Sequence, residues 1–584
     1  MANPMDFYYT NGRNVQILIS VLKANNIRKV IVSPGTTNIE FVASIQNDDS
    51  FEMYSCVDER SAAYMACGLA AESGEPVVLT CTEATASRNY FPGLTEAYHR
   101  KLPVLAVTCL HDCNAIGHLE PQVIDRSVSP NDVFKLKVEL TNHDEWDSVV
   151  KINNAVLELT RHGGGPVHIN LPWLNNDFEL QTKEFPPARV IKRYNFSDTL
   201  PPLPNGRIGV FVGSHNEWTK AQADALDRFC ETTGAVVFCD LTSKYYGKYR
   251  VKTQLLAMQP KDYDIFSSFA LVIHIGEETG DLYTQGKLKA CAKEVWRVSP
   301  DGELRDSFHK LRNVFEMDEE FFFNHYAKGG NYDNTIVAQY KKDYDELVAS
   351  VPEIPFSSVY AASIMSKAIP ENSVLHLGVS DTIRVWSMFP LSENVRTSCN
   401  AGCRGIDGCV SALVGASLVN RDKLYFGVTG DLTFFYDMNV LGNREIGNNV
   451  RIMIINNNGG NIFRHKNAPA ERRMGMDNAN KFVAAAGHFG RKSRSLLKHY
   501  TEDLGFEYLS ADNKEDFLKA YKRFTEPQLT DKPMFFEVFT TAEDDNEAFH
   551  IMQTLATDSK HRAKSAIKSI LGKQGTQIVK KIKK

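Results

Sequence analysis

Short strands rich in β-branched residues recur along this chain, and a segment with a helical pattern separates each strand from the next. The first such unit has a helical pattern over 14–25 and a strand pattern over 30–32. Comparable strands follow at 76–80, 104–108, 208–212, 235–238, 271–275, 374–377, 424–428 and 451–455. Strands separated in this way predict parallel α/β sheets. Sheets of this kind bind their ligands outside the carboxyl ends of the strands.

Two breaks that contain several prolines divide this pattern. They lie at 186–204 and 351–355, and a chain of 584 residues is too long for one hydrophobic core. We therefore expect three tandem, doubly wound parallel-sheet domains over 1–186, 205–350 and 356–545, followed by a basic helical tail over 546–584.

The composition is typical of a soluble globular protein, with 43% hydrophobic and 23% charged residues. The sequence shows no apolar run long enough to span a bilayer and no secretory signal, and its eleven cysteines are scattered as in a reduced protein. These features predict a cytoplasmic protein. Without the nine basic residues of 560–584, the net charge of −5 becomes −14, with 57 basic against 71 acidic residues. This charge predicts that the body of the chain binds no nucleic acid.

The basic tail has an amphipathic pattern. Ile567 and Leu571, and then Ile578 and Ile582, recur at helical spacing among lysines. Two interpretations stay open. The segment is either a cationic helix in peripheral contact with the inner face of an anionic membrane, or a solvated tail. Membrane contact would suit an enzyme of cell-envelope glycan assembly.

The most specific motif has two parts. Gly430-Asp431-Leu432 follows a predicted strand, and about 26 residues after Asp431 a second strand ends in Asn456-Asn457-Asn458-Gly459-Gly460. Gly430 has no Cβ, so its backbone can approach a diphosphate closely. Carboxylate, amide and carbonyl oxygens are ligands that Mg²⁺ prefers, together with phosphate oxygens. The two parts therefore predict a magnesium diphosphate site.

This motif is one of four segments that carry a family resemblance. The others are Ser33-Pro34-Gly35, Asp58-Glu59-Arg60-Ser61-Ala62-Ala63 and Gly405-Ile406-Asp407-Gly408, and the motif itself continues to Ile462-Phe463. Together they resemble the thiamine-diphosphate-dependent enzymes of the pyruvate-oxidase-like branch, and among these the menaquinone-pathway synthases. The similarity extends over about residues 10–540 and is most specific in the first and third units.

The resemblance implies a fold, two cofactors and an assembly. The first domain would bind the pyrimidine of thiamine diphosphate, the third would bind its diphosphate with Mg²⁺, and a Rossmann-like domain would lie between them. Glu59 stands where the family has the catalytic acid that activates the aminopyrimidine. The family forms homodimers or homotetramers in which each active site takes one domain from each of two chains.

The resemblance also assigns the cofactor and metal residues. Matching the motif at Ile462 and Phe463 selects Asp431, Asn457 and Gly459 as metal ligands, whereas counting from Asp431 would select Asn458 and Gly460. We prefer the first alignment, because the intervening loop can lose a residue more easily than the apolar pair can shift. Glu59, Gly430, Asp431, Leu432, Asn457, Ile462 and Phe463 are the predicted cofactor contacts.

Substrate positions differ from those of the menaquinone-pathway synthases. Three arginines of that group are replaced here by Thr37, His111 and Ala401. Threonine or alanine cannot replace the bidentate grip of arginine on a carboxylate. Since isochorismate, the acceptor of those synthases, carries more than one carboxylate, the changes predict a different acceptor. His118 and Glu83 are further polar groups expected near this pocket.

Other substrate positions match the family. Ser380 and Arg384 match a Ser-x-x-x-Arg pair that grips the distal carboxylate of the donor, and Gln122 matches a catalytic glutamine near the reacting carbon. We therefore expect a 2-oxo-acid decarboxylase or carboligase that uses an acidic donor such as 2-oxoglutarate and an unknown acceptor. The alternatives are a menaquinone-pathway synthase, a non-catalytic scaffold with this fold, and a flavin-dependent oxidase. The sequence shows no phosphate-binding glycine loop in the middle domain that would favour the oxidase.

Overall fold

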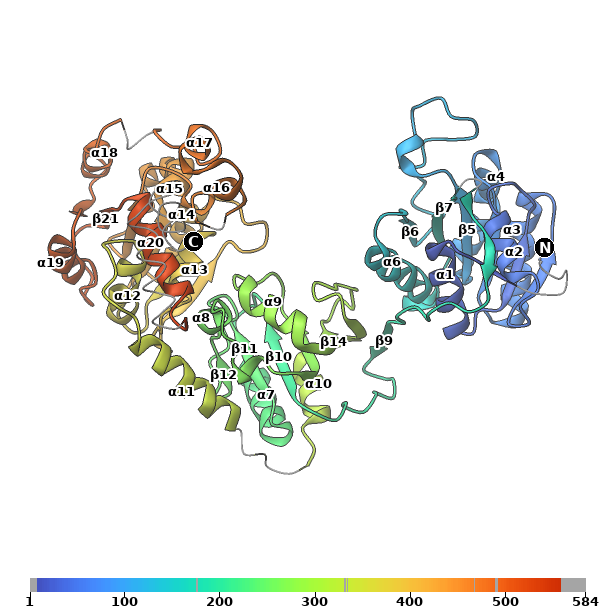
Figure 1. Cartoon of the computed structure of the whole chain (residues 1–584), viewed down its shortest axis with the longest axis horizontal. Coiled ribbons are helices and arrows are strands. Elements are labelled where there is room, and N and C mark those ends of the chain that lie inside the picture. Colours follow the sequence, from blue (N-terminus) through green and yellow to red (C-terminus); the bar gives the residue numbers. More distant parts are fainter. Residues whose placement is uncertain are drawn as a thin grey trace, which may run out of the picture. The chain divides into compact units, whose positions relative to one another are not determined.

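A computed structural model describes residues 8–174, 177–329, 332, 335–466, 468–488 and 492–557. It divides into two compact units, one formed by Met1–Leu200 with Pro300–Glu316 and the other by Pro201–Ser299 with Met317–Lys584. Figure 1 labels the helices and strands of both units. Residues 558–584 lie outside the described part, and so does the predicted amphipathic pattern within them.

The first unit contains a six-stranded parallel sheet in the order β3-β2-β4-β5-β7-β6. Its strands are β2 (Lys29–Val32), β3 (Glu52–Ser55), β4 (Val77–Cys81), β5 (Val104–Leu110), β6 (Leu136–Glu139) and β7 (Val167–Pro172). Its main helices are α1 (Arg13–Ala24), α2 (Ile39–Ile45), α3 (Glu59–Ser73), α5 (Phe91–Arg100) and α6 (Glu145–Glu158). The remaining strands of this unit pair as β1 (Tyr9–Thr10) with β8 (Leu180–Thr182), and as β9 (Lys192–Asn195) with β15 (Leu311–Glu316).

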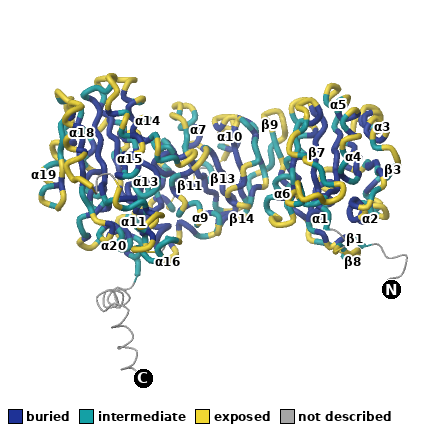
Figure 2. Tube along the Cα trace, turned by 90° about the horizontal axis from the view of Figure 1, so that it is seen from above, coloured by how far each residue is buried: buried dark blue, intermediate teal, exposed yellow. Residues whose placement is uncertain are grey.

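Helices cover both faces of this sheet. Val30 of β2 packs in a core with α1 and α6, whereas the next residue, Ile31, packs in a second core with α3 and α5. Successive side chains of a strand point to opposite faces, so this split places helices on both sides. Figure 1 shows α1 and α6 on one side of the sheet and α3 on the other. Figure 2 shows the central strands, such as β7, as buried.

The second unit contains two further parallel sheets. The first has the order β12-β11-β10-β13-β14, with β10 (Ile208–Val212), β11 (Val236–Cys239), β12 (Arg250–Val251), β13 (Phe269–Ile275) and β14 (Ala292–Val298). The second has the order β17-β16-β18-β19-β21-β20, with β16 (Val374–Leu377), β17 (Arg396–Cys399), β18 (Tyr425–Gly430), β19 (Val450–Asn456), β20 (Glu507–Ala511) and β21 (Met534–Phe539). Both are flanked by helices, including α7 (Lys220–Thr233), α9 (Leu282–Cys291), α12 (Ser358–Ala368), α13 (Asp381–Trp386), α14 (Cys409–Ser417), α15 (Asp431–Asp437) and α20 (Ala542–Gln553).

The predicted α/β class with several parallel sheets is confirmed, but the predicted limits of the domains differ from this division. Residues 300–316 belong to the first unit, because β15 pairs with β9. Helix α20 runs across the predicted limit at residue 546 and contacts α12. The part of the predicted tail over 546–553 is therefore a packed helix of the second unit. Among the described residues, no helix has the length and apolar character needed to cross a membrane.

Candidate active site

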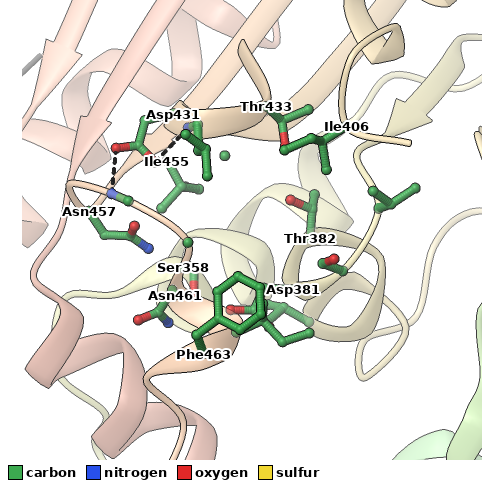
Figure 3. Close-up of a pocket in the computed structure, with 18 of the residues that line it drawn as sticks. Ser358, Asp381, Thr382, Ile406, Asp431, Thr433, Ile455, Asn457, Asn461 and Phe463 are labelled. Atoms are coloured by element: carbon green, nitrogen blue, oxygen red, sulfur yellow. Dashed lines mark hydrogen bonds between the residues drawn. The ribbon is translucent and has the colours of Figure 1, made fainter. Parts of the chain in front are cut away.

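A cavity of about 300 Å³ opens at the carboxyl ends of β18 and β19 in the second unit (Figure 3). This is the edge at which parallel sheets bind ligands. Three segments supply most of its lining: the junction of β18 with α15, the loop after β19, and α13. Of the predicted cofactor residues, Gly430, Asp431, Leu432, Asn457, Gly459, Ile462 and Phe463 all line it, together with Ser380 and Ile406.

Asp431 is the first residue of α15, and its side chain is buried, with 5% of the residue exposed. Its carboxylate accepts hydrogen bonds from the backbone N–H groups of Leu432 (2.8 Å) and Gly459 (3.0 Å). Burial outweighs these bonds and raises the pKa of Asp431 to about 7. A cation at this carboxylate would oppose the effect of burial and favour the ionised form.

The two candidate asparagines have different surroundings. Asn457 donates its amide N–H to Asp545 (2.8 Å), while its Oδ1 is buried and has no hydrogen-bond partner among the described residues. In contrast, Oδ1 of Asn458 accepts a bond from the N–H of Gly487 (3.0 Å), and Asn458 does not line the cavity. The structure therefore leaves the amide oxygen of Asn457, and not that of Asn458, available to a ligand.

The two glycines of the motif have different roles. Gly459 has φ +135°, and a Cβ there would lie 2.5 Å from the backbone oxygen of Ala484, so only glycine fits this turn. At Gly430, in contrast, a Cβ would meet no protein atom within 4 Å. The space in front of Gly430 belongs to the cavity and is available to a ligand.

Two residues that the sequence did not suggest hold the loop after β19 in place. Arg464 is buried, and it donates to the backbone oxygens of Asn457 (3.0 Å) and Asn458 (2.7 Å). Asp545, at the start of α20, accepts from the backbone N–H of Ser358 (2.6 Å) as well as from Asn457. Arg464 directly follows Phe463 and could have been suspected from that position. No local pattern connects Asp545 with the motif, since 88 residues separate it from Asn457.

Helix α13 carries the predicted donor residues. Ser380 stands immediately before this helix at φ +68° and ψ −118°, a strained conformation for a residue other than glycine. Arg384 lies one turn further on and lines two other cavities, of about 300 Å³ and about 100 Å³. On the same helix, the carboxylate of Asp381 lies 2.8 Å from the ring of His465. Burial opposes the ionisation of both groups, but the attraction and hydrogen bond between them are stronger. The pKa of Asp381 is therefore lowered, and the pKa of His465 is raised.

Glu59 is the first residue of α3 in the first unit. The helix begins there because Asp58 caps it by accepting a bond from the N–H of Ser61 (2.7 Å). Glu59 is partly buried, and the side chain of Asn89 donates to its carboxylate at 3.4 Å. The buried alanines that follow, Ala62 and Ala63 among them, pack the helix against the sheet.

The other predicted residues of the first unit differ in accessibility. Thr37 is buried, and its hydroxyl donates to the backbone oxygen of Cys109 (2.5 Å), so its hydrogen is already used within the unit. His111 is partly exposed, and its Nδ1 lies 2.8 Å from the buried carboxylate of Glu83. Gln122 is exposed at φ +67° in the segment between β5 and β6. His111 and Gln122 are therefore accessible in this unit, and Thr37 is not.

The cavity in the second unit suits a divalent metal bound to a diphosphate. It offers one buried carboxylate, one unpartnered amide oxygen and space in front of Gly430. No cluster of three or more His, Cys, Asp or Glu side chains that could hold a metal occurs in the described part of the chain. A hard cation held mainly by oxygens, with phosphate oxygens completing its shell, fits the groups that are present.

Comparisons with known proteins agree with this geometry. Residues 13–128 match the family model described as the thiamine pyrophosphate enzyme, N-terminal TPP binding domain, and this match includes Glu59. The 2-succinyl-5-enolpyruvyl-6-hydroxy-3-cyclohexene-1-carboxylate synthase of Bacteroides fragilis is 30% identical over 560 residues, covering 92% of this chain and 98% of the relative. The synthase of Bacteroides thetaiotaomicron is 30% identical over 559 residues, covering 92% and 97%. That of Porphyromonas gingivalis is 26% identical over 492 residues, covering 79% and 85%.

The fold, the cavity and the matched N-terminal domain define a thiamine-diphosphate-dependent enzyme, with thiamine diphosphate and a divalent metal as its cofactors. Within this class, the chain belongs to the family of 2-succinyl-5-enolpyruvyl-6-hydroxy-3-cyclohexene-1-carboxylate synthases.

Proposed function

We propose that this enzyme is a carboligase that makes the product named in its relatives, 2-succinyl-5-enolpyruvyl-6-hydroxy-3-cyclohexene-1-carboxylate. In this reaction 2-oxoglutarate loses CO₂, and the remaining fragment is joined to isochorismate. The observation that carries the proposal is the 30% identity that extends over 92% of the chain and 98% of a synthase. The changed arginines had favoured a different acceptor, but the comparisons support the synthase better. No finding supports a role in glycan assembly.

The second unit supplies the proposed cofactor site. We assign the metal to the carboxylate of Asp431, Oδ1 of Asn457 and the backbone oxygen of Gly459. This assignment is supported by the unpartnered Oδ1 of Asn457 and by the burial of Asp431. Asp545 and Arg464 orient the loop that carries these groups. Predicted contacts of Leu432, Ile462 and Phe463 with the cofactor are consistent with their place in the cavity.

The first unit supplies the proposed activating acid. Thiamine diphosphate, when bound, provides the carbon–carbon chemistry that a 2-oxo acid alone cannot undergo. Glu59 would share a proton with the pyrimidine ring of the bound cofactor and so promote that chemistry. His111, held by Glu83, and Gln122 are proposed substrate contacts. Thr37 stays in the proposal as a positioning residue, because its hydroxyl is already bonded within the unit.

Ser380 and Arg384 are the proposed donor contacts. A guanidinium forms two parallel hydrogen bonds to a carboxylate, which selects an acidic 2-oxo acid over a neutral one. Arg384 makes no ion pair within 4 Å with any side chain of the described residues, although its charge helps to lower the pKa of Asp381. The strained backbone at Ser380 is consistent with a position kept for binding.

The decisive experiment combines the protein with thiamine diphosphate, Mg²⁺, 2-oxoglutarate and isochorismate. We expect CO₂ release, consumption of isochorismate and a product of the mass of the synthase product. The Glu59→Gln variant is the control, because it lacks the proposed activating carboxylic acid and should show little turnover. CO₂ release with no consumption of isochorismate would instead favour a second function, decarboxylation or ligation to another acceptor. The replacement of arginines by Thr37, His111 and Ala401 is the observation that keeps this second function in view.

The assembly and the location of the enzyme are proposals of the same kind. We expect a homodimer or homotetramer, which the sedimentation of the purified protein measures. We also expect a cytoplasmic protein, and a peripheral membrane contact through 560–584 stays a prediction from the sequence.

A further inference from the structure

A small cavity of about 100 Å³ lies beside α13, next to the donor residues. Ser380 and Arg384 line it from α13 and its start, while Ala401 and Arg404 line it from the segment that follows β17. Arg404 also lines the larger cavity that contains Asp431. Arg404 therefore borders both the proposed cofactor space and the proposed donor space.

Two guanidinium groups dominate the charge of this small cavity. No acidic side chain of the described residues lines it. Cys399 also lines it, but burial raises the pKa of this thiol to about 12, so it remains neutral. Two acids lie close to its lining: Asp240, whose Oδ2 already accepts from the hydroxyl of Thr279 (2.8 Å) and the N–H of Gly280 (2.6 Å), and Asp381, whose carboxylate pairs with His465 at 2.8 Å. The side chains that line the cavity therefore carry a net positive charge, and the two nearby carboxylates are already bonded within the unit.

Most N–H donors of the Arg404 side chain have no protein partner among the described residues. Among the described residues, its side chain has one hydrogen bond, from Nη2 to the backbone oxygen of Thr279 at 3.1 Å, and it has no ion pair. A guanidinium carries five N–H donors, so several remain free. The backbone of Arg404 has φ +54°, a region that residues other than glycine seldom occupy. Arg404 is exposed, so these donors meet solvent in the absence of a ligand, and an arginine with free donors beside a cavity suits the binding of an anion.

The position of Arg404 also bears on one of the changed arginines. The resembling synthases carry an arginine where this chain has Ala401, and this chain has an arginine three residues later. Ala401 is buried and lines the same small cavity as Arg404. This cavity therefore has a guanidinium from Arg404, although position 401 supplies none.

We propose that Arg404 is a specificity-determining residue that binds the distal carboxylate of a 2-oxo dicarboxylic donor together with Arg384. This inference rests on the proposed function and adds a specificity-determining residue to the same site. Two guanidiniums around one carboxylate predict a preference for dicarboxylic over monocarboxylic donors.

The test compares 2-oxoglutarate with 2-oxopentanoate, in which a methyl group replaces the distal carboxylate. We expect Arg404→Ser to lower kcat/KM for 2-oxoglutarate by about 10- to 100-fold, mainly through KM, and to change the value for 2-oxopentanoate less than about threefold. Arg404→Lys keeps the positive charge but loses the two parallel N–H donors of the guanidinium. Its kcat/KM for 2-oxoglutarate should lie between those of Arg404→Ser and the wild type. Arg444→Ser is the matched control, since the side chain of Arg444 is 93% exposed.

A binding measurement separates this inference from the proposed function. Glutarate, which cannot react, is titrated into the protein without thiamine diphosphate and followed by calorimetry. We expect Arg404→Ser to weaken glutarate binding at least tenfold, with an unchanged thermal midpoint and unchanged affinity for thiamine diphosphate with Mg²⁺. Equal glutarate affinity and equal donor preference in the folded variant would overturn the inference while leaving the proposed function intact. Binding of glutarate that depends on Arg404, in a protein that turns over no 2-oxo acid, would show a dicarboxylate site at Arg404 but refute the proposed function and, with it, the donor role of this residue.

Discussion

Replacing Asp431 by asparagine removes the buried charge on which the proposed metal site depends. The residue is 5% exposed, and burial raises its pKa from the usual 3.8 to about 7. In the metal-free protein, the folded state then binds a proton more tightly than the unfolded state does. The contribution of Asp431 to stability is fully present below about pH 4 and is lost as the pH rises to about 7.

The size of this effect follows from the two pKa values. At about 1.4 kcal/mol for each pH unit, the rise from 3.8 to about 7 corresponds to about 4 kcal/mol of unfolding free energy. Asparagine has no such charge, so the free energy of unfolding of Asp431→Asn should gain about 4 kcal/mol relative to wild type between pH 4 and pH 8. Loss of one of the two N–H contacts adds a cost of about 1–3 kcal/mol that does not depend on pH.

Urea unfolding in EDTA at several pH values between 4 and 8 measures this difference. Thr429→Val is the control, since it removes a buried hydroxyl of β18 and no titratable group. Mg²⁺ with thiamine diphosphate should stabilise the wild type at pH 8 and leave Asp431→Asn nearly unchanged, because the metal loses its carboxylate ligand. A difference between Asp431→Asn and wild type that stays constant from pH 4 to pH 8 would refute the reasoning.

Four further predictions test other parts of the structure. Glu59→Gln should reduce turnover at least 100-fold with little change in Tm, and full activity in this variant would remove Glu59 from the mechanism. Asn457→Ala should weaken Mg²⁺ binding at least tenfold and Asn458→Ala much less; the reverse order, seen by calorimetry, would shift the ligand by one position. Arg464→Met should lower the free energy of unfolding by about 3 kcal/mol, since two backbone oxygens lose a charged donor, and unchanged urea unfolding would contradict this. Deleting 560–584 should abolish salt-sensitive binding to anionic vesicles, and a full-length protein that binds none at low salt would end the membrane hypothesis.

Much of the fold could be predicted because its signals are local. A run of apolar residues in the sequence predicts each buried strand, as the run over 451–455 does for β19. The strand-helix alternation then predicts parallel sheets without knowledge of any contact. The limits of the units were harder to predict from the sequence, because the pairing of β15 with β9 joins segments that lie far apart in the chain. Helix α20 was assigned partly to the tail for the same reason, since its contact with α12 is invisible locally.

The candidate site shows the same division. Asp431 and Asn457 could be predicted from a motif whose spacing carries the chemistry, and both line one cavity. The motif alone left Asn457 and Asn458 as alternatives. Their different hydrogen bonds, which depend on Asp545 and Gly487, distinguish them in the structure.

The sequence by itself determined the class of sheet, the thiamine-diphosphate motif and the positions at which arginines had been replaced. Each of these can be recognised from residues that lie close together along the chain. Only the tertiary structure decided which polar groups are free and which are already used. Thr37 proved to be buried and bonded to Cys109, while Arg404 lies beside Arg384 at a shared cavity. Burial and partner choice depend on contacts between distant segments, and these exist only once the chain has folded.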